Sequence, residues 1–376
     1  MIDPTAIAPF AKQSQLQVLS CEHPEISVAP VKLRTSRALA PPVLSWNGVG
    51  RNVPLAHCVP PAAEAPLFIA SVERAAVAVL GPNPSSYLLS ADGQLVSEAL
   101  DPGLGVQRRA KIDRKELRHE CVVHPARDEH VLTFAGQRRG YWHWWIDALS
   151  RIWMSDEHNS EQRPLRLATP PLSDGFLRQS LECLGLLDRV VELKRGITPF
   201  ARVSFTPGLT GSSSRWPATP LRSYAAWLRE RLGLETTAPR RRLLISRADA
   251  RWRRIVNQEQ LATELAELGF ETIECGRMPL REQIETFAEA EFVVGAHGAG
   301  LTNALFAPPG TRVLEIFAAD NARDPSNYRV LASHLGFPYG RLLGDPVHTR
   351  PRGGSNQQDL AVDVATVRRA VVALGA

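Results

Sequence analysis

Apolar runs and helically spaced apolar residues alternate through the second half of the chain. The predicted helices carry apolar residues on one face, at Leu261, Leu265 and Leu268 and then at Leu280, Ile284 and Phe287. The predicted strands are the runs RLLIS, ETIE, EFVVG and TRVLEIF. Strands that alternate with helices in this way predict β-α-β crossovers and a parallel, Rossmann-like sheet.

The first half of the chain shows shorter patterns of the same two kinds. Short strands are predicted by AAVAVLG, SYLLSADGQLVSE, ECVVHP and EHVLTFAG, with a hairpin turn at Ala91-Asp92-Gly93. After the stretch YWHWWIDALSRIWM, strands are predicted by LRLAT, RVVELK and ARVSFTP, and a helix by residues 176–186. This alternation predicts a further α/β domain.

Breaks in the periodicity divide the chain into four parts. Residues 1–65 are rich in proline and have no sustained period, which predicts an irregular or short-stranded segment. The stretch PGLTGSSSRWPATP interrupts the pattern again and predicts a domain boundary. We therefore expect an α/β fold with an N-terminal lobe at 66–215, a Rossmann-like lobe at 216–350 and a closing helix at 351–376.

Composition narrows the class of protein. A chain of 376 residues, 44% of them hydrophobic, can bury at least one core, and its length favours two domains. The five cysteines are scattered without a CxxC pattern, which argues against a disulfide framework or a zinc site. No export signal is recognisable, and no segment approaches the roughly 18 apolar residues that span a bilayer. These features predict a cytoplasmic protein.

The net charge of +5 comes from arginine, in runs such as APRRRLL and ARWRRI. Such runs could bind nucleic acid, an anionic membrane surface or a phosphorylated substrate. A solvated basic face is the simpler explanation of any single run. Charge alone leaves these alternatives open.

A glycine-rich loop, AHGAG, follows the strand EFVVG, and a short helix is predicted after it. Glycine lets the backbone approach a ligand closely, and a helix N-terminus favours an anion, so the loop suits a phosphate. Its glycines read G-x-x-G-x-G, which is not the dinucleotide fingerprint G-x-G-x-x-G. His297 lies at the tip, able to donate to a phosphate or a sugar hydroxyl. A tight turn with an incidental histidine is an equal alternative.

Arginine is concentrated after the strand RLLIS, at Arg247, Arg251, Arg253 and Arg254. Ligands of open α/β sheets lie beyond the carboxyl ends of the strands, so Arg247 and His297 should converge. The planar guanidinium group matches a diphosphate, and we expect one or two of these arginines to touch ligand. Glu315, in TRVLEIF, is expected at the same edge, where it would bind ribose hydroxyls or pair with an arginine.

The stretch YWHWWIDALSRIW holds four of the eight tryptophans. Helical angles place Trp142, Trp145, Ile146, Leu149, Ile152 and Trp153 on one apolar face. The same angles place His143, Asp147 and Arg151 on a polar stripe, with Trp144 beside it. An amphipathic helix with an Asp147–Arg151 salt bridge explains this without any function. A sugar-binding cleft, with Trp144 stacking on a sugar ring, is the other interpretation.

Together, YWHWWID, ISRADARWRRIVNQEQL, VVGAHGAGLTNALFAPPGTRVLEIF and YRVLASHLGFPY resemble the family 61 glycosyltransferases, which include bacterial capsular polysaccharide enzymes. The resemblance covers residues 130 to about 345, and the first 130 residues show none. It implies a glycosyltransferase-B fold, in which two Rossmann-like lobes face each other across a cleft. It also implies an inverting transferase that uses a nucleotide-sugar donor and a glycan or lipid-linked acceptor in cell-surface polysaccharide biosynthesis.

The resemblance assigns roles to individual residues. Diphosphate and nucleotide contacts are implied for Ser246, Arg247, Arg254 and Asn257. A donor-phosphate loop is implied for Gly295, His297, Gly298, Ala299, Gly300, Leu301, Thr302 and Asn303, and a donor contact for Glu315. In the first lobe, an aromatic residue, His143 and Asp147 match the family pattern, with Trp144 and Arg151 expected at the acceptor. The asparagine usual before these aromatic residues is missing, because Arg139-Gly140 stands there.

A mechanism follows from this assignment. Inversion requires one displacement, in which a base takes the proton of the acceptor hydroxyl while the nucleoside diphosphate leaves. Asp147 is the candidate base, and His143 is the second candidate. No Asp-x-Asp pair is present, so we expect no obligatory metal and no cofactor. No nucleic acid partner is expected, and arginine-rich surfaces leave peripheral association with the inner face of a membrane open.

Two other functions remain compatible with the sequence. A nicotinamide-dependent oxidoreductase would also contain a Rossmann-like lobe, although the glycine spacing argues against it. A non-catalytic carbohydrate-binding or scaffold protein would use the same sugar contacts. Donor, acceptor and oligomeric state are not encoded in any motif that we recognise.

Overall fold

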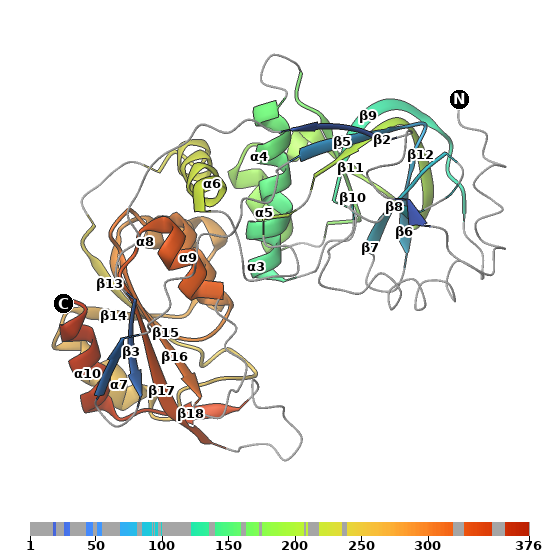
Figure 1. The fold of residues 1–376 in the computed structure, drawn as a ribbon. Coiled ribbons are helices and arrows are strands. Elements are labelled where there is room, and N and C mark those ends of the chain that lie inside the picture. Colours follow the sequence, from blue (N-terminus) through green and yellow to red (C-terminus); the bar gives the residue numbers. More distant parts are fainter. Residues whose placement is uncertain are drawn as a thin grey trace. The chain divides into compact units, whose positions relative to one another are not determined.

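A computed structural model describes most of the chain, and its contacts divide the chain into two units (Figure 1). Unit 1 comprises residues 1–34 and 64–216, and unit 2 comprises residues 35–63 and 217–376. None of the described helices is long and apolar enough to cross a membrane. The structure describes the backbone of strands 18–19, 26–30, 43–47 and 51–54, and residues 68–80, 85–91, 93, 95–96, 99, 122–134, 140–158, 163–172, 175–206, 208–209, 218–234, 239–318, 327–347 and 358–375.

Unit 2 is built on an eight-stranded sheet whose main strands are parallel. Its order is β14-β13-β15-β16-β17-β3-β4, with β18 paired to β17. The strands are β13 (Arg241–Ile245), β14 (Phe270–Ile273), β15 (Ala290–Ala296), β16 (Arg312–Ala318), β17 (Tyr339–Val347), β3 (Val43–Asn47), β4 (Arg51–Pro54) and β18 (Asp359–Ala361). The predicted parallel sheet is confirmed. The strand order reverses between β13 and β15, because β14 and β15 lie on opposite sides of β13.

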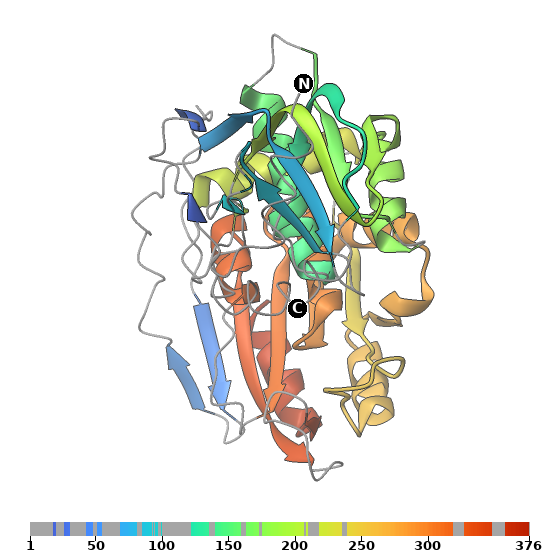
Figure 2. The ribbon, with the colours of Figure 1, turned by 90° about the vertical axis from the view of Figure 1, so that its right-hand side faces the viewer.

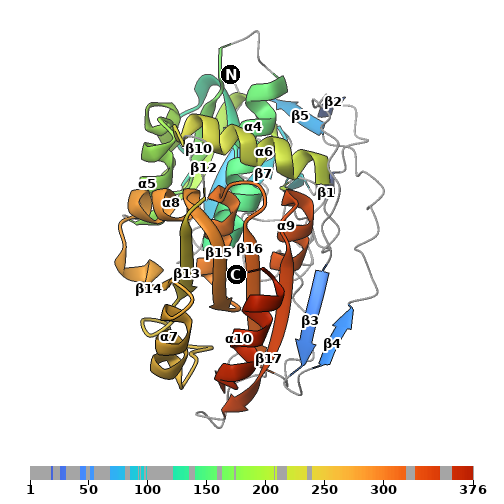
Figure 3. The same cartoon turned by 90° about the vertical axis from the view of Figure 1, so that its left-hand side faces the viewer.

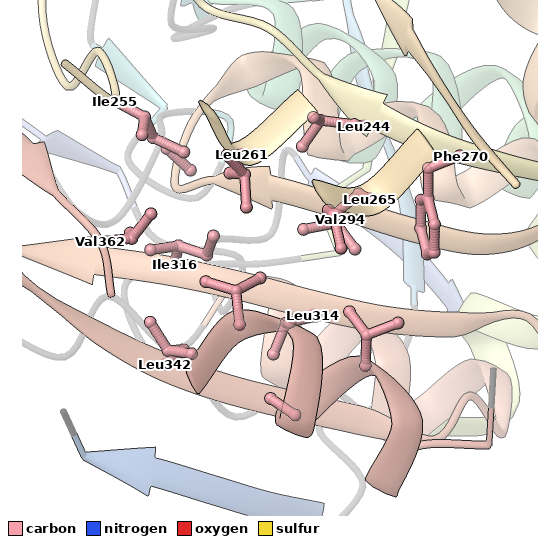
Figure 4. Packing of buried hydrophobic residues seen from close by; sticks show 14 of the residues in the cluster. Leu244, Ile255, Leu261, Leu265, Phe270, Val294, Leu314, Ile316, Leu342 and Val362 are labelled. Atoms are coloured by element: carbon pink, nitrogen blue, oxygen red, sulfur yellow. The ribbon is translucent and has the colours of Figure 1, made fainter. Parts of the chain in front are cut away.

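Helices pack on this sheet through the apolar faces that the spacing predicted. The helices of unit 2 are α6 (Ala218–Arg231), α7 (Gln258–Ala266), α8 (Leu280–Ala288), α9 (Asn327–Leu335) and α10 (Val364–Ala373). Leu261 and Leu265 of α7 are fully buried in one cluster with Leu244, Val294 and Leu314 of the strands (Figure 4). Burying each such leucine contributes about 1.5–3 kcal/mol. Figure 3 shows α10 in front of the strands, and β3 and β4 beyond β17.

Two predicted helices of unit 2 differ from the structure. The closing helix is shorter than expected, because Asp359–Ala361 form β18, which is antiparallel to β17. Asp363 then caps α10 by accepting a hydrogen bond from the N–H of Thr366. The short helix after the glycine loop is a 3₁₀-helix, η6 (Ala299–Phe306). In the first case strand pairing replaces the first turns of the predicted helix. In the second, a short segment takes the tighter 3₁₀ form, which is common in short helices.

Unit 1 contains a ten-stranded mixed sheet rather than a second uniform parallel sheet. Its strands are β1 (Val18–Leu19), β2 (Ile26–Pro30), β5 (Phe68–Glu73), β6 (Ala76–Leu80), β7 (Ser85–Leu89), β8 (Leu95–Val96), β9 (Arg127–Thr133), β10 (Arg166–Thr169), β11 (Val190–Glu192) and β12 (Gly196–Phe205). The run β12-β9-β10-β11 is parallel throughout, and β1 is parallel to β8. Strand β12 pairs antiparallel with β6 at its start and with β5 at its end. Figure 2 shows β12, in yellow-green, beside the blue strands.

The expectation of two similar Rossmann-like lobes therefore holds only in coarse form, as a mixed α/β fold with two sheets. In unit 1 the antiparallel strands β6 and β7 come from the patterns AAVAVLG and SYLLSADGQLVSE, whereas no pattern predicted β5. The predicted hairpin turn is confirmed: β7 and β8 are antiparallel, and Gly93 has a φ of 76°. The helices of this unit are α3 (Tyr141–His143), η3 (Trp144–Ala148), α4 (Leu149–His158), α5 (Phe176–Cys183) and η4 (Leu187–Arg189).

Within its described residues, the proline-rich segment 1–65 contributes four short strands, whose positions its pattern did not predict. Strands β1 and β2 pair within the sheet of unit 1. Strands β3 and β4 extend the sheet of unit 2, where β3 is parallel to β17. The segment thus takes part in both sheets through backbone pairing.

Candidate functional site

The edge of the parallel sheet in unit 2 brings two predicted ligand-binding segments together. Ile245 at the end of β13 is in register with Gly295 of β15. Ser246 and Arg247 directly follow the first strand, and His297 directly follows the second. The strand order reverses between these two strands, which is the point where open α/β sheets bind their ligands. The predicted convergence of Arg247 and His297 on this edge is therefore consistent with the topology.

Arg247 is held against the glycine loop. Its Nη2 and Nε donate to the carbonyl oxygen of Trp252, over 3.0 and 3.3 Å. A Cβ atom at Gly298 would lie 1.8 Å from Nη1 of Arg247, so this glycine leaves the space that the guanidinium group occupies. Burial lowers the pKa of Arg247, and the neighbouring charge of Arg253 lowers it further. Arginine stays protonated despite such shifts, so the site presents a buried positive charge.

The other glycines of the loop allow close packing within the sheet. A Cβ at Gly300 would lie 3.1 Å from Cγ2 of Ile245 and 3.4 Å from Sγ of Cys275. A Cβ at Gly295 would lie 3.1 Å from Cβ of Ile245. Burial raises the pKa of the Cys275 thiol to about 11. The small size of Gly295 and Gly300 therefore allows the loop to pack against Ile245 of β13.

His297 is fixed by a buried carboxylate. Its Nδ1 and Oε1 of Glu315 are 2.5 Å apart, and the hydroxyl of Tyr339 donates to Oε2 of Glu315 over 2.6 Å. The imidazole ring stacks on Phe317, with ring centroids 4.9 Å apart. Because Nδ1 faces the carboxylate, a ligand would meet the Nε2 side of the ring.

The sequence had suggested that Glu315 lies open at the edge of the sheet, but the structure places it in the interior. The carboxylate is almost wholly buried, and both oxygens already accept hydrogen bonds within the protein. Its geometry fits a residue that orients His297 better than one that binds ribose hydroxyls. Strand residues alternate between faces, and the side chain of Glu315 points to Tyr339 on the next strand rather than outward.

Arg254 and Asn257 are engaged with strand β18 instead of with Arg247. The guanidinium group of Arg254 pairs with Asp359, with Nη2 and Oδ2 2.7 Å apart. The side-chain amide of Asn257 donates to the carbonyl oxygen of Val362 and accepts from its N–H. Sequence reasoning assigned both residues to the donor, but their partners lie more than one hundred positions away in the chain and left no local signal.

Most of the other residues predicted to bind the nucleotide-sugar donor make contacts within the protein. The hydroxyl of Ser246 accepts a hydrogen bond from the N–H of Ala248. Leu301, Thr302 and Asn303 are buried in η6, and the amide of Asn303 donates to Gln283. Ala299 is exposed at the start of this helix. The loop would therefore meet a ligand chiefly through its backbone.

Two residues at this edge were not singled out by sequence reasoning. Tyr328 of α9 is buried, and its hydroxyl donates to the carbonyl oxygen of Gly298 over 2.7 Å. Arg253 was one of four clustered arginines, and its backbone φ of 60° sets it apart from the others. The motif YRVLASHLGFPY contains Tyr328, so the resemblance offered a signal for that residue. Nothing in the sequence distinguished Arg253 from Arg254.

Unit 1 carries the second predicted site on an irregular helix. The segment η3 is a π-helix, in which the N–H of Leu149 donates to the carbonyl oxygen of Trp144. Nδ1 of His143 and Oδ2 of Asp147 are 2.8 Å apart, and both side chains are partly exposed. Gly208 packs directly on Asp147, because a Cβ there would lie 2.8 Å from Cβ of Asp147. π-Turns inside α-helices are frequent at functional sites.

The predicted polar stripe on this helix is wrong for two residues. The apolar face is buried as predicted, but Trp144 and Arg151 are buried too, with 4% and 3% of their surface exposed. Nε1 of Trp144 donates to Oγ of Ser180, and its ring packs against Phe134. The π-turn inserts one residue per turn, so angles of 100° per residue misplace these side chains. Asp147 pairs with His143, the residue one turn before it.

No group of three or more His, Cys, Asp or Glu side chains that could hold a metal ion lies within the described part of the chain. The two described cysteines, Cys183 and Cys275, are not part of a disulfide. The charged groups that the fold brings together at the edge of unit 2 are arginines, a histidine and one buried carboxylate. This set suits an anion more than a cation.

Comparison with known proteins finds glycosyltransferases that are similar to parts of this chain. The chain is 26% identical over 139 residues to the EGF domain-specific O-linked N-acetylglucosamine transferase of Drosophila melanogaster, covering 36% of this chain and 26% of that protein. It is 50% identical over 42 residues to a beta-1,2-xylosyltransferase of Oryza sativa subsp. japonica, covering 11% of this chain and 8% of the relative. A beta-1,2-xylosyltransferase of Arabidopsis thaliana is 26% identical over 99 residues, covering 23% of this chain and 18% of that protein.

These alignments span about a quarter or less of each relative's length. Their names concern N-acetylglucosamine and xylose transfer, and none of the three concerns capsular polysaccharide, so that part of the resemblance stays a prediction. The matching segment begins at the helix that carries the His143–Asp147 pair and ends one residue before Glu315. Residues 141–314 of this chain are similar to the family described as Glycosyltransferase 61.

Proposed function

We propose that the protein transfers a sugar from a nucleotide-diphosphate donor to a hydroxyl group of a glycan or lipid-linked acceptor. The observation that carries this proposal is the meeting of Arg247 and the glycine loop at the strand-order reversal of unit 2, inside the segment similar to glycosyltransferases. A guanidinium group and backbone N–H groups suit a diphosphate. The names of the relatives support a hexosyl or pentosyl group as the transferred sugar.

Stabilisation of the leaving group is the task of unit 2 in this proposal. Negative charge develops on the diphosphate as the glycosidic bond breaks. Arg247 lies beside Gly298 at the start of η6, so a positive charge and the N-terminal N–H groups of that helix act on the same region. His297, oriented by Glu315, adds a donor to a phosphate or sugar oxygen. These groups are preorganised by the sheet, so little reorganisation accompanies the reaction.

Unit 1 supplies the base. Asp147 accepts the proton of the acceptor hydroxyl while that oxygen attacks the anomeric carbon. His143 contacts the carboxylate at 2.8 Å and orients it. The alternative is that His143 takes the proton and Asp147 holds the ring. Attack from the face opposite the leaving diphosphate inverts the configuration of the sugar.

The finer parts of the proposal extend beyond this chemistry. We propose a glycosyltransferase-B arrangement of the two units, a cytoplasmic location with peripheral association at the inner face of a membrane, and a role in cell-surface polysaccharide biosynthesis. Arginine provides the positive charge toward the diphosphate, so we propose that the reaction needs no metal. Activity retained in excess chelator would agree with this part, and activity restored only by a divalent ion would contradict it.

The experiment is a screen of nucleotide sugars by thermal shift, followed by assays of donor hydrolysis and of transfer. The proposal expects stabilisation by a nucleoside diphosphate and slow hydrolysis of one nucleotide sugar. Arg247→Ala should lose that stabilisation, whereas Arg251→Ala, at an exposed position on the same loop, should keep it. Binding of NADH with no response to nucleoside diphosphates would favour an oxidoreductase. Sugar binding without hydrolysis or transfer would favour a carbohydrate-binding or scaffold protein.

A further inference from the structure

Arg253 has a backbone conformation that an arginine rarely adopts. Its φ of 60° lies in the left-handed region, where among the described non-glycine residues only Arg74 joins it. Such conformations persist only where the surrounding structure holds them, and they concentrate at functional sites.

The residues on either side of Arg253 are pinned by separate contacts. The carbonyl oxygen of Trp252 accepts hydrogen bonds from the guanidinium group of Arg247. The N–H of Arg254 donates to Oδ1 of Asp359 over 2.9 Å, and its carbonyl oxygen accepts from the N–H of Leu360. The loop is therefore tied to β13 on one side and to β18 on the other, which sets the direction in which Arg253 leaves the backbone.

The guanidinium group of Arg253 is drawn into the site rather than into solvent. Its Nε is buried, with no hydrogen-bond partner among the described residues. Burial lowers the pKa of Arg253, and the nearby Tyr328 and Glu315 offset this in part. The ion pairs of the described residues include Arg254 with Asp359 but none of Arg253.

Two partly buried arginines thus lie near each other with little opposing charge. The charge of Arg253 contributes to the lowered pKa of Arg247. Both oxygens of Glu315 are engaged by His297 and Tyr339, and Asp359 is engaged by Arg254. Asp249 is the remaining carboxylate that acts on Arg247. Buried like charges are costly unless an anion joins them, so this arrangement is suited to a polyanionic ligand.

We propose that Arg253, together with Arg247, binds the diphosphate of the donor, and that Arg254 is a structural residue. This inference rests on the proposed function and deepens it, because it names the second arginine of the donor site. Two guanidinium groups favour a diphosphate over a monophosphate, since each can engage a different phosphoryl group. Arg253 thereby acts as a determinant of specificity for the diphosphate.

The test measures the affinity of purified full-length protein for UDP, GDP, UMP and inorganic pyrophosphate by calorimetry. Arg253→Gln should weaken binding of the preferred nucleoside diphosphate by about 10- to 100-fold, as loss of a charge-assisted hydrogen bond predicts. The preference of the protein for UDP over UMP should shrink. Arg251→Gln is the exposed control and should bind like the wild type.

Arg253→Gly separates ligand binding from a merely structural role. Glycine adopts a positive φ without strain, so this variant should unfold at the same temperature as the wild type or higher, yet bind the diphosphate as poorly as Arg253→Gln. Wild-type affinity in both variants would overturn the role of Arg253 alone. If the wild type binds none of UDP, GDP and pyrophosphate, the proposed donor site itself is overturned.

Discussion

Two histidine–carboxylate pairs lie in the part of the chain that the structure describes, one in each unit, and they differ in exposure, separation and origin. His143 and Asp147 lie four positions apart on an irregular helix, 2.8 Å from each other, with 29% and 15% of their side chains exposed. His297 and Glu315 come from two neighbouring strands, 2.5 Å apart, with 14% and 1% exposed. Tyr339 adds a further donor to Glu315.

This difference separates two uses of the same residue types. A buried carboxylate whose two oxygens both accept hydrogen bonds has no oxygen left for a ligand and holds its neighbour in place. A carboxylate at a partly exposed position on a helix is accessible to a substrate hydroxyl. The proposed function therefore places proton transfer at the pair in unit 1 and ligand positioning at the pair in unit 2. The variants below test that division, beginning with the largest expected effect.

Asp147→Asn should lower the rate of sugar transfer by about 10²- to 10⁴-fold, because it removes a general base. Affinity for the nucleoside diphosphate, measured by calorimetry, should stay at the wild-type value. Glu157→Gln, at an exposed position on the same helix, is the control and should keep full activity. If both Asp147→Asn and His143→Ala transfer sugar at a rate close to that of the wild type, neither residue is the general base.

Gly298→Ala should weaken nucleoside diphosphate binding by about tenfold or more, because the added methyl group displaces the guanidinium group of Arg247. The matched control is Ala299→Ser, which adds one atom at the next, exposed position. Titration of both variants with UDP and GDP provides the measurement. Equal affinities in the two variants would show that the position of Arg247 does not matter for binding.

Glu315→Gln should lower the free energy of unfolding by about 1–3 kcal/mol, since it weakens a buried hydrogen-bond network. Urea denaturation of the purified protein measures this loss. Tyr339→Phe removes one hydrogen bond of the same network and should have a smaller effect. If Glu315→Gln leaves the free energy of unfolding unchanged but weakens binding of the ribose, the result would favour the direct contact with the donor that the sequence had suggested.

Ser180→Ala should cost about 1 kcal/mol, the smallest effect, because the indole N–H of Trp144 loses its buried acceptor. Thermal or urea unfolding measures the change, and Ser180→Thr, which keeps a hydroxyl group, is the control. Acceptor kinetics should not change. If the KM for acceptor rises in Ser180→Ala while stability holds, Trp144 contacts the acceptor in some conformation after all.

The sequence predicted the parallel core of unit 2 well, because its strands are apolar runs and its helices carry one apolar face. Leu261, Leu265 and Ile284 are fully buried where the spacing placed them. The convergence of Arg247 and His297 followed from topology alone, since both succeed parallel strands. These predictions depend on local patterns and on one general rule of sheet architecture.

The differences between the sequence analysis and the structure have long-range or backbone causes. Arg254 and Arg253 are adjacent and chemically identical in the sequence, and only the φ of Arg253 and the distant Asp359 distinguish them. Trp144 was misplaced because nothing in the sequence announces a π-turn. Glu315 seemed open to ligand because Tyr339, which covers it, lies on a strand that follows later in the chain.

Strand β3 adds a constraint on how the protein is made. Val43 pairs with Tyr339, about 300 positions further along, and ribosomes add roughly 5–20 residues per second. The early strand therefore leaves the ribosome some 15–60 s before its partner exists, roughly calculated from that rate. During that interval the strand lacks its native pairing partner and can pair with other chains unless a chaperone covers it. We therefore expect the yield of folded unit 2 to depend on translation speed.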